Sequence, residues 1–152
     1  MANLRTYGIY KVKEMYQPFV IGRERLLYDL LKEDGQQNDC MREVDYLCDR
    51  LEEELINEAI MTNLGKGFTS IECREGEYKL THPVKGSILI SRTSYALNVF
   101  CDGSRMLDLD LFVALSGSDD RFFAVMDGRG EWGWLKPVKY TNLRTREENI
   151  YL

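Results

Sequence analysis

The sequence predicts an α+β fold in one domain spanning residues 1–152, with a mostly antiparallel sheet packed against about three helices. The length of 152 residues is that of one ordinary domain. Between residues 23 and 65 the apolar residues follow a helical period, whereas after residue 66 they form short runs separated by turn sequences. Elements in this order pack helices onto a sheet.

The first 35 residues predict a strand followed by a helix. The segment 5–14, RTYGIYKVKE, is rich in aromatic and β-branched residues, which is typical of a short strand. A stripe of leucines at i, i+1, i+4 and i+5 then predicts a helix that the region of Gly35 ends. Pro18 and Gly22 leave two alternatives open: the helix begins near Pro18, or MYQPF forms a separate turn. The stripe consists of Leu26, Leu27, Leu30 and Leu31.

A second helix is predicted over residues 39–65, where the helical period continues for more than four turns. Asp39 is a suitable N-cap and Gly65 a suitable C-terminal stop. The apolar positions are Val44, Leu47, Cys48, Leu51, Leu55, Ile56, Ala59 and Ile60. The other face carries Glu52, Glu53, Glu54 and Glu58, which we interpret as a solvated surface, with an electrostatic docking surface as the alternative.

The rest of the chain predicts strands around one further helix. Residues 66–103 contain short apolar runs broken by REGE, HPVKG and SRTS, as successive antiparallel strands do. A third helix is expected over 103–117, capped by Ser104 and ended by Gly117. A buried strand at 121–127, a glycine turn and a final extended segment at 132–140 complete the prediction.

Composition and charge exclude several classes of function. The formal net charge is −5 and the isoelectric point is near 5.0, whereas proteins that bind nucleic acid directly gain affinity from Lys and Arg. Neither an apolar signal segment nor a run of 18 apolar residues is present, so we expect neither membrane insertion nor secretion. The expected location is cytoplasmic.

The titratable residues do not form a recognisable catalytic or metal-binding motif, so we expect neither an enzyme nor a cofactor. His82 is the single histidine and precedes Pro83, which indicates a solvated turn. Asp108 and Asp110 fit the polar side of an amphipathic helix, and two further aspartates, at 119 and 120, fit a turn. The cysteines form no C-x-x-C pair and are interpreted as buried free thiols. They are Cys40, Cys48, Cys73 and Cys101.

The element order resembles an acetyltransferase-like scaffold. Those enzymes hold a pyrophosphate on the backbone amides of a glycine-rich loop between the central strand and the following helix. The corresponding sequence, FCDGSRML, contains only Gly103, and Asp102 would repel phosphate. The resemblance therefore extends to the scaffold and not to activity.

Two segments suggest recognition of another protein. MYQPFVIGRER holds more apolar side chains than the start of one helix buries, which fits either an interface or the core. Tyr16 and Val20 share one face by their i, i+4 spacing, and Phe19 and Arg23 lie on a neighbouring face. These apolar residues are Met15, Tyr16, Phe19, Val20 and Ile21.

The second segment, EWGWLKPVKY at 131–140, holds both tryptophans. Trp132 and Trp134 point to the same side of an extended strand. Pro137 indicates that this strand lies at a sheet edge, because proline cannot donate a ladder hydrogen bond. We expect one tryptophan in the core and the other partly exposed. The segment would then support the surface formed by the first helix and keep it rigid.

FVIGRERLLYDLL and FFAVMDGRGEWGWLKPVK are similar, in this order, to the two signature regions of the SirA family, the sporulation inhibitors of replication. The resemblance implies a non-enzymatic cytoplasmic protein that binds the N-terminal domain of the initiator DnaA. It also implies that Tyr16 and Val20, with Phe19 adjacent and Arg23 in the G-R-E motif, face that domain, and that Pro137 is functionally sensitive. The alternatives are an acyl-CoA-dependent transferase and a binding module for another protein partner.

Overall fold

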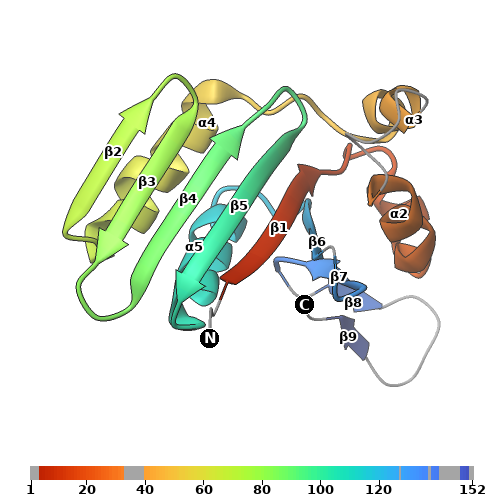
Figure 1. Ribbon diagram of the computed structural model, residues 1–152. Helices are drawn as coiled ribbons and strands as arrows, with labels where there is room; N and C mark the ends of the chain where they lie inside the picture. The colour runs from red at the N-terminus through yellow and green to blue at the C-terminus, as the bar shows by residue number, and fades with distance from the viewer. Residues whose placement is uncertain (1–3, 33–39, 127, 137, 141–147, 151–152) are drawn as a thin grey trace.

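The computed structural model describes residues 4–32, 40–126, 128–136, 138–140 and 148–150, and it confirms the predicted α+β class (Figure 1). One seven-stranded sheet has the order β2-β3-β4-β5-β1-β6-β7, and all its neighbouring strands are antiparallel. Its strands are β1 (Leu4–Lys11), β2 (Ser70–Arg74), β3 (Glu77–His82), β4 (Gly86–Arg92), β5 (Ala96–Gly103), β6 (Phe122–Met126) and β7 (Glu131–Trp134). β8 (Val138–Tyr140) and β9 (Glu148–Ile150) form a separate pair.

The described residues contain five α-helices where the sequence predicts about three. They are α1 (Gln17–Val20), α2 (Glu24–Leu31), α3 (Cys40–Leu47), α4 (Glu53–Glu58) and α5 (Met106–Ser116). A π-helical turn, η1 (Ala59–Leu64), and a 3₁₀ turn, η2 (Gly65–Gly67), continue α4. The difference in number arises because both predicted N-terminal helices are interrupted.

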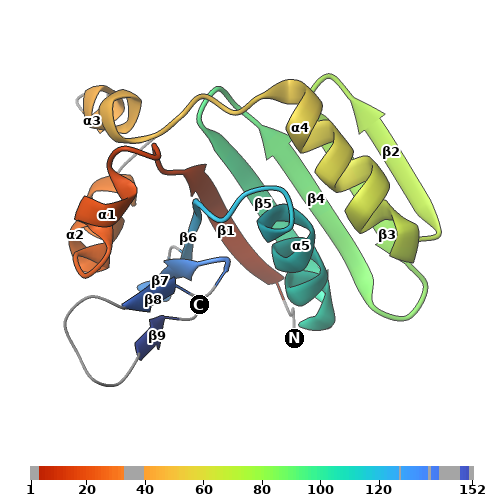
Figure 2. The same cartoon turned by 180° about the vertical axis from the view of Figure 1, so that it is seen from behind.

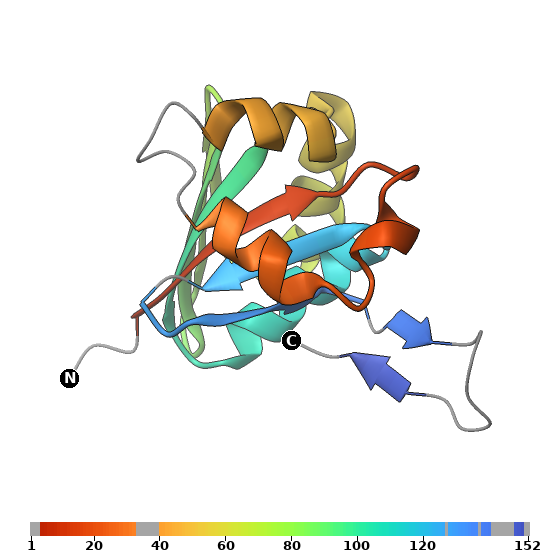
Figure 3. The ribbon, with the colours of Figure 1, turned by 90° about the vertical axis from the view of Figure 1, so that its right-hand side faces the viewer.

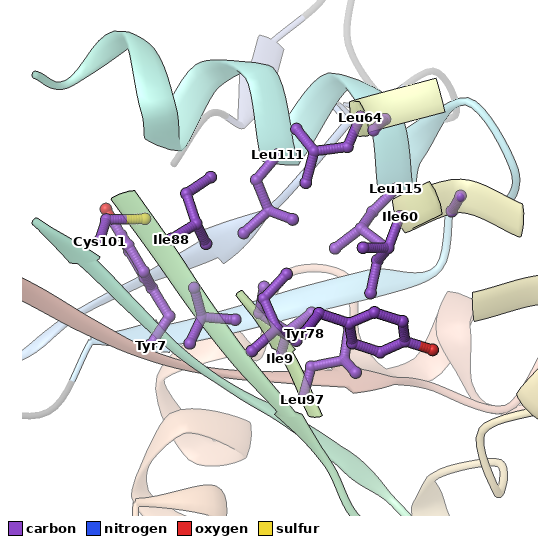
Figure 4. Packing of buried hydrophobic residues seen from close by; sticks show 14 of the residues in the cluster. Tyr7, Ile9, Ile60, Leu64, Tyr78, Ile88, Leu97, Cys101, Leu111 and Leu115 are labelled. Carbon is purple, nitrogen blue, oxygen red and sulfur yellow. The ribbon is translucent and has the colours of Figure 1, made fainter. Parts of the chain in front are cut away.

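The sheet separates two hydrophobic clusters, because successive side chains of a strand point to opposite faces. On β1, Ile9 belongs to one cluster and Tyr10 to the other. On β6 the residues alternate in the same way and all five are buried, which explains the uninterrupted apolar sequence FFAVM. Figure 4 shows the first cluster, in which Leu111 and Leu115 of α5 pack over Ile9 and Leu97.

The helices divide between the two faces. α4, η1 and α5 cover the first cluster, as Figure 2 shows from behind. α2 and α3 pack on the second cluster beside β1, β6 and β7 (Figure 3). On this second face no described helix covers the part of the sheet formed by β2–β5 (Figure 1), and Leu89 and Phe100 are exposed there as a cross-strand pair.

The prediction of a single helix over residues 39–65 is wrong. Within the described residues the chain leaves the helix at Cys48, which pairs with Val12 as an isolated β-bridge, and it re-enters a helix at Glu53. The amide of Asp49 donates to Lys11, and that of Leu51 donates to the carbonyl of Ser94, 2.8 Å away in each case. These bonds to β1 and to the loop between β4 and β5 replace the helical bonds. The two parts of the apolar stripe consequently pack in different clusters.

The strands and the helix predicted between residues 66 and 126 are confirmed. Strands β2 to β5 occupy residues 70–103, and α5 begins after Ser104, whose hydroxyl accepts the amide of Met106 at 3.1 Å, and ends before Gly117. β7 is an edge strand with Trp134 buried and Trp132 partly exposed, as expected. The four glutamates at positions 52, 53, 54 and 58 are exposed, in agreement with a solvated face.

Candidate functional site

The segment MYQPF forms a separate one-turn helix, α1, and this decides between the two alternatives left open by the sequence. Pro18 lies in its first turn, where a missing amide hydrogen breaks no helical bond. The chain then reverses at Gly22, whose φ of +95° lies in the left-handed region that favours glycine. α1 therefore projects from the fold ahead of α2 (Figure 3).

Phe19 is the most prominent predicted residue on this projection. Its side chain is 63% exposed. The guanidinium of Arg23 lies 4.6 Å from the centre of the Phe19 ring and donates a hydrogen bond of 2.7 Å to the Phe19 carbonyl. Arg23 thus spans the turn at Gly22 and restricts the ring that faces solvent.

Val20 points the other way. It is only 5% exposed and belongs to the second hydrophobic cluster. Tyr16 and Val20 share one face, as their spacing predicts, but the outward position of Val20 that the resemblance implies is wrong. The Val20 amide donates to the Tyr16 carbonyl at 3.0 Å, so the i, i+4 relation holds, but the face it defines packs on the second cluster. Val20 therefore fastens α1 to the core.

Tyr16 is partly buried against the second cluster, and its ring lies 5.0 Å from that of Tyr46, centre to centre. Tyr46 is an exposed residue of α3 that the sequence analysis did not select. One sequence signal could have identified Tyr46: it lies on the polar side of the predicted helix, where an aromatic residue is unusual. Lys13 lies over the same Tyr46 ring at 6.0 Å.

Two further exposed apolar residues extend this surface. Met15 precedes α1, and Leu26 lies one turn into α2, on the side turned away from the core. We call the set the α1 surface. It consists of Met15, Tyr16, Phe19, Arg23, Leu26 and Tyr46.

The tryptophan segment supports α2, as predicted. The rings of Tyr28 and Trp132 stack with their centres 4.8 Å apart. The indole nitrogen of Trp134 donates to Oε2 of buried Glu24 at 3.1 Å, and the Gly22 amide donates to both oxygens of the same carboxylate. Glu24 therefore joins the turn after α1 to β7. Pro137 lies outside the described residues.

A buried charged cluster lies on the opposite face of the sheet and corrects the prediction for Asp108. Asp108 does not lie on a polar helix face, because α5 turns it into the protein, where its Oδ1 lies 2.6 Å from Nη2 of Arg5. Tyr7 also donates to this carboxylate. Burial alone would raise the pKa of Asp108, but the hydrogen bonds from Arg5 and Tyr7 outweigh it and lower the pKa.

Asp108 and Tyr7 also line a cavity of about 640 Å³ between α5 and the turn from β6 to β7. Its other walls are mostly apolar, with Phe112 and Trp132 among them. The Asp108 carboxylate accepts two hydrogen bonds from Arg5. Burial and the hydrogen bond to Asp108 raise the pKa of the Tyr7 hydroxyl. Neither group is prepared to accept a proton at neutral pH.

The loop that acetyltransferase-like enzymes would use for pyrophosphate is occupied by the protein itself. The Ser104 amide donates to the Lys85 carbonyl at 2.8 Å, and Arg5 donates to the Gly103 and Ser104 carbonyls. A Cβ at Gly103, where φ is +127°, would lie 2.2 Å from the Lys85 oxygen. This close packing explains the glycine without a ligand, and the acetyltransferase resemblance is not confirmed.

The remaining titratable residues serve local structure. His82, the last residue of β3, accepts hydrogen bonds from the amides of Val84 and Lys85 at 3.0 Å in the turn that follows it. Cys48 and Cys101 are buried, as expected, and burial raises the pKa of Cys101. Cys73 is exposed, contrary to expectation. Among the residues that the structure describes, no three His, Cys, Asp or Glu side chains gather as a metal site requires.

In the described part of the chain, none of the helices combines the length and the apolar character needed to cross a membrane. A comparison with curated proteins finds no match. A protein-family model described as sporulation inhibitor of replication protein SirA matches residues 5–139, a range that contains both signature regions in full. The chain therefore belongs to the SirA family.

Proposed function

We propose that this protein inhibits the initiation of DNA replication by binding the N-terminal domain of DnaA with its α1 surface. The family description gives the general role, a sporulation inhibitor of replication. The resemblance of FVIGRERLLYDLL and the C-terminal segment to the SirA signatures supports the choice of partner. Action on DnaA also requires that the protein work in the cytoplasm.

The observation that carries the proposal is the exposed Phe19 ring held between α1 and Arg23. Aromatic and arginine side chains dominate the energetics of protein interfaces, because they remove large areas from water with few rotatable bonds to freeze. Here the ring already rests on the guanidinium of Arg23. Less conformational entropy is lost on docking when the anchor is ordered beforehand.

The other residues of the predicted site take different parts in this proposal. Arg23 contributes directly because it contacts the Phe19 ring, and Tyr16 contributes through its contact with the exposed Tyr46 ring. Val20 contributes from below by fixing α1 to the core. Pro137 remains a predicted contributor on the strength of the family resemblance alone.

The test is calorimetric titration of the protein with the isolated N-terminal domain of DnaA. Phe19→Ala should weaken binding at least about tenfold, because loss of an interface anchor costs about 2 kcal/mol. The matched control is Phe100→Ala, which removes the same side chain from the uncovered face of the sheet. It should leave the affinity within about twofold of wild type.

Absence of wild-type binding at tens of micromolar would refute DnaA as the partner. Binding that Phe19→Ala and Phe100→Ala reduce equally would keep DnaA but refute the α1 surface. Melting temperatures of both variants must be measured alongside. Phe19→Ala should melt within a few degrees of wild type, because its ring is mostly in water.

A further inference from the structure

Helix α5 presents apolar residues on its solvent side as well as on its core side. Leu107, Leu111 and Leu115 are buried against the sheet. Three more apolar residues face outward at i, i+3 and i+7, with Leu109 54% exposed. A surface helix that buries only one face carries polar residues on the other. The outward residues, which we call the α5 ridge, are Met106, Leu109 and Val113.

A groove runs beside the ridge. It has a volume of about 720 Å³ and extends from Met106 to Gly117, roughly 16 Å along an α-helix. The ridge forms one wall, and Leu64, Lys66 and Gly67 of the η1–η2 segment form the other. A convex apolar ridge and a longer concave groove therefore lie side by side on one molecule.

We propose that this face binds a second copy of the chain, with α5 of each copy lying antiparallel in the groove of the other. A twofold interface requires that one patch be complementary to itself. An antiparallel arrangement centred on Leu111 brings Leu109 of each copy opposite Val113 of the other. The ridge of each copy then enters the groove of its partner, so Leu109 and Val113 gain apolar neighbours, and Met106 lies opposite Ser116 at the end of the contact.

The charges at the ends of α5 favour the same arrangement. Arg105 stands at the N-terminal end, and in the described part of the chain no ion pair involves it. In an antiparallel pair it approaches the last turn of the partner α5, where carbonyl groups carry partial negative charge and exposed Asp120 follows. Asp110 enters the contact already neutralised by Lys85, 2.9 Å away.

The contact is smaller than that of a permanent dimer, which buries roughly 1,000 Å² or more on each subunit. Three ridge residues and the walls of one groove supply less than this area. We therefore expect a reversible dimer with a dissociation constant of roughly 100 µM. This association leaves the α1 surface accessible, because α1 and α2 pack on the opposite face of the sheet.

The experiment is sedimentation equilibrium of the full chain from about 5 µM to 1 mM. Wild type should shift from monomer to dimer across this range. Leu109→Glu should weaken association at least about tenfold, since it places a charge in the groove of the partner. Leu89→Glu is the matched control, because Leu89 is similarly exposed, at 46%, on the other face of the sheet. It should associate like wild type.

Arg105→Glu tests the orientation. It should weaken association, because the new carboxylate meets the negative end of the partner helix. Stronger association would indicate parallel helices and overturn the arrangement. A wild type that stays monomeric at 1 mM, or equal effects of Leu109→Glu and Leu89→Glu, would overturn the interface itself. None of these readouts involves DnaA, so they are independent of the proposed function.

Discussion

At the scale of single residues, the most consequential group is the carboxylate of Asp108. It accepts hydrogen bonds from Nε and Nη2 of Arg5 and from Tyr7, and these residues are almost fully buried. A charge removed from water is tolerated only when a partner and hydrogen bonds replace the lost hydration. Asp108 and Arg5 therefore depend on each other, and together they tie α5 to β1.

We predict that Asp108→Asn lowers the free energy of unfolding by about 3–5 kcal/mol, because it leaves the Arg5 guanidinium buried and uncompensated. Urea denaturation at pH 7 measures this loss. Asp110→Asn is the control, since Asp110 pairs with Lys85 at a partly exposed site and should cost under about 1 kcal/mol. Equal losses would mean that burial of the Asp108 pair has no special importance.

The lowered pKa of Asp108 also predicts how stability depends on pH. A carboxyl group with a lower pKa in the folded state stabilises the protein above its unfolded pKa, about 3.9. This contribution disappears as the pH falls through the lower folded value. Wild type should therefore lose stability steeply below about pH 4, and Asp108→Asn should show a shallower decline over the same range.

At the scale of elements, the turn between α1 and α2 is held from the distant strand β7. The carboxylate of Glu24 accepts the Gly22 amide and the Trp134 indole, and Trp132 stacks on Tyr28 of the same helix. The two segments that resemble the SirA signatures are thus in direct contact. Their coupling fixes the direction in which α1 projects.

We predict that Glu24→Ala destabilises the protein by about 2 kcal/mol, because it removes hydrogen bonds to a buried charged acceptor. It should also weaken binding to the DnaA domain by more than the small decrease in the folded fraction at 25 °C accounts for, because α1 loses the contact that positions it. Glu24→Gln keeps one acceptor oxygen and should recover part of both losses. Unfolding and binding measured on the same samples provide the comparison. An unchanged affinity for Glu24→Ala would show that α1 is positioned without this contact.

The elements also show how far the sequence predicts the structure. The strands of residues 70–103, α5 and β6 follow from local patterns of apolar and turn residues. The break at Cys48 does not, because its cause is a bridge to Val12 and hydrogen bonds to β1 that lie far away in the chain. The 3.6 period continues through residues 48–52 since both flanking helices have an apolar side. Their sides face different clusters.

The candidate site was predictable to the same extent. The exposure of Phe19 was predictable because the segment near Pro18 contains more apolar residues than a short helix can bury. Arg23 is exposed beside it. The inward position of Val20 depends on a one-turn helix ended by Gly22, and the pairing of Tyr16 with Tyr46 depends on the packing of α1 against α3. The ion pair of Arg5 and Asp108 joins residues 103 positions apart, beyond the reach of local patterns.

At the scale of the whole molecule, the sheet keeps two surfaces apart. The α1 surface rests on the second cluster and the α5 ridge on the first, with the strands β1 and β6 between them. Sites that share no partner residues contribute independently to free energy. A dimer formed through α5 would therefore carry two α1 surfaces and bind two DnaA domains.

We predict that the two surfaces act without influencing each other. Leu109→Glu should weaken self-association at least about tenfold and leave the affinity of each chain for the DnaA domain within about twofold. Phe19→Ala should weaken binding to the DnaA domain and leave self-association unchanged. The double variant should show both losses with no additional change in unfolding free energy beyond their sum. Calorimetry of the double variant and its parents, at concentrations above and below the dimer dissociation constant, measures this. If Leu109→Glu weakens DnaA binding tenfold, the sheet transmits the state of one face to the other, and dimerisation would then regulate inhibition rather than merely doubling its valence.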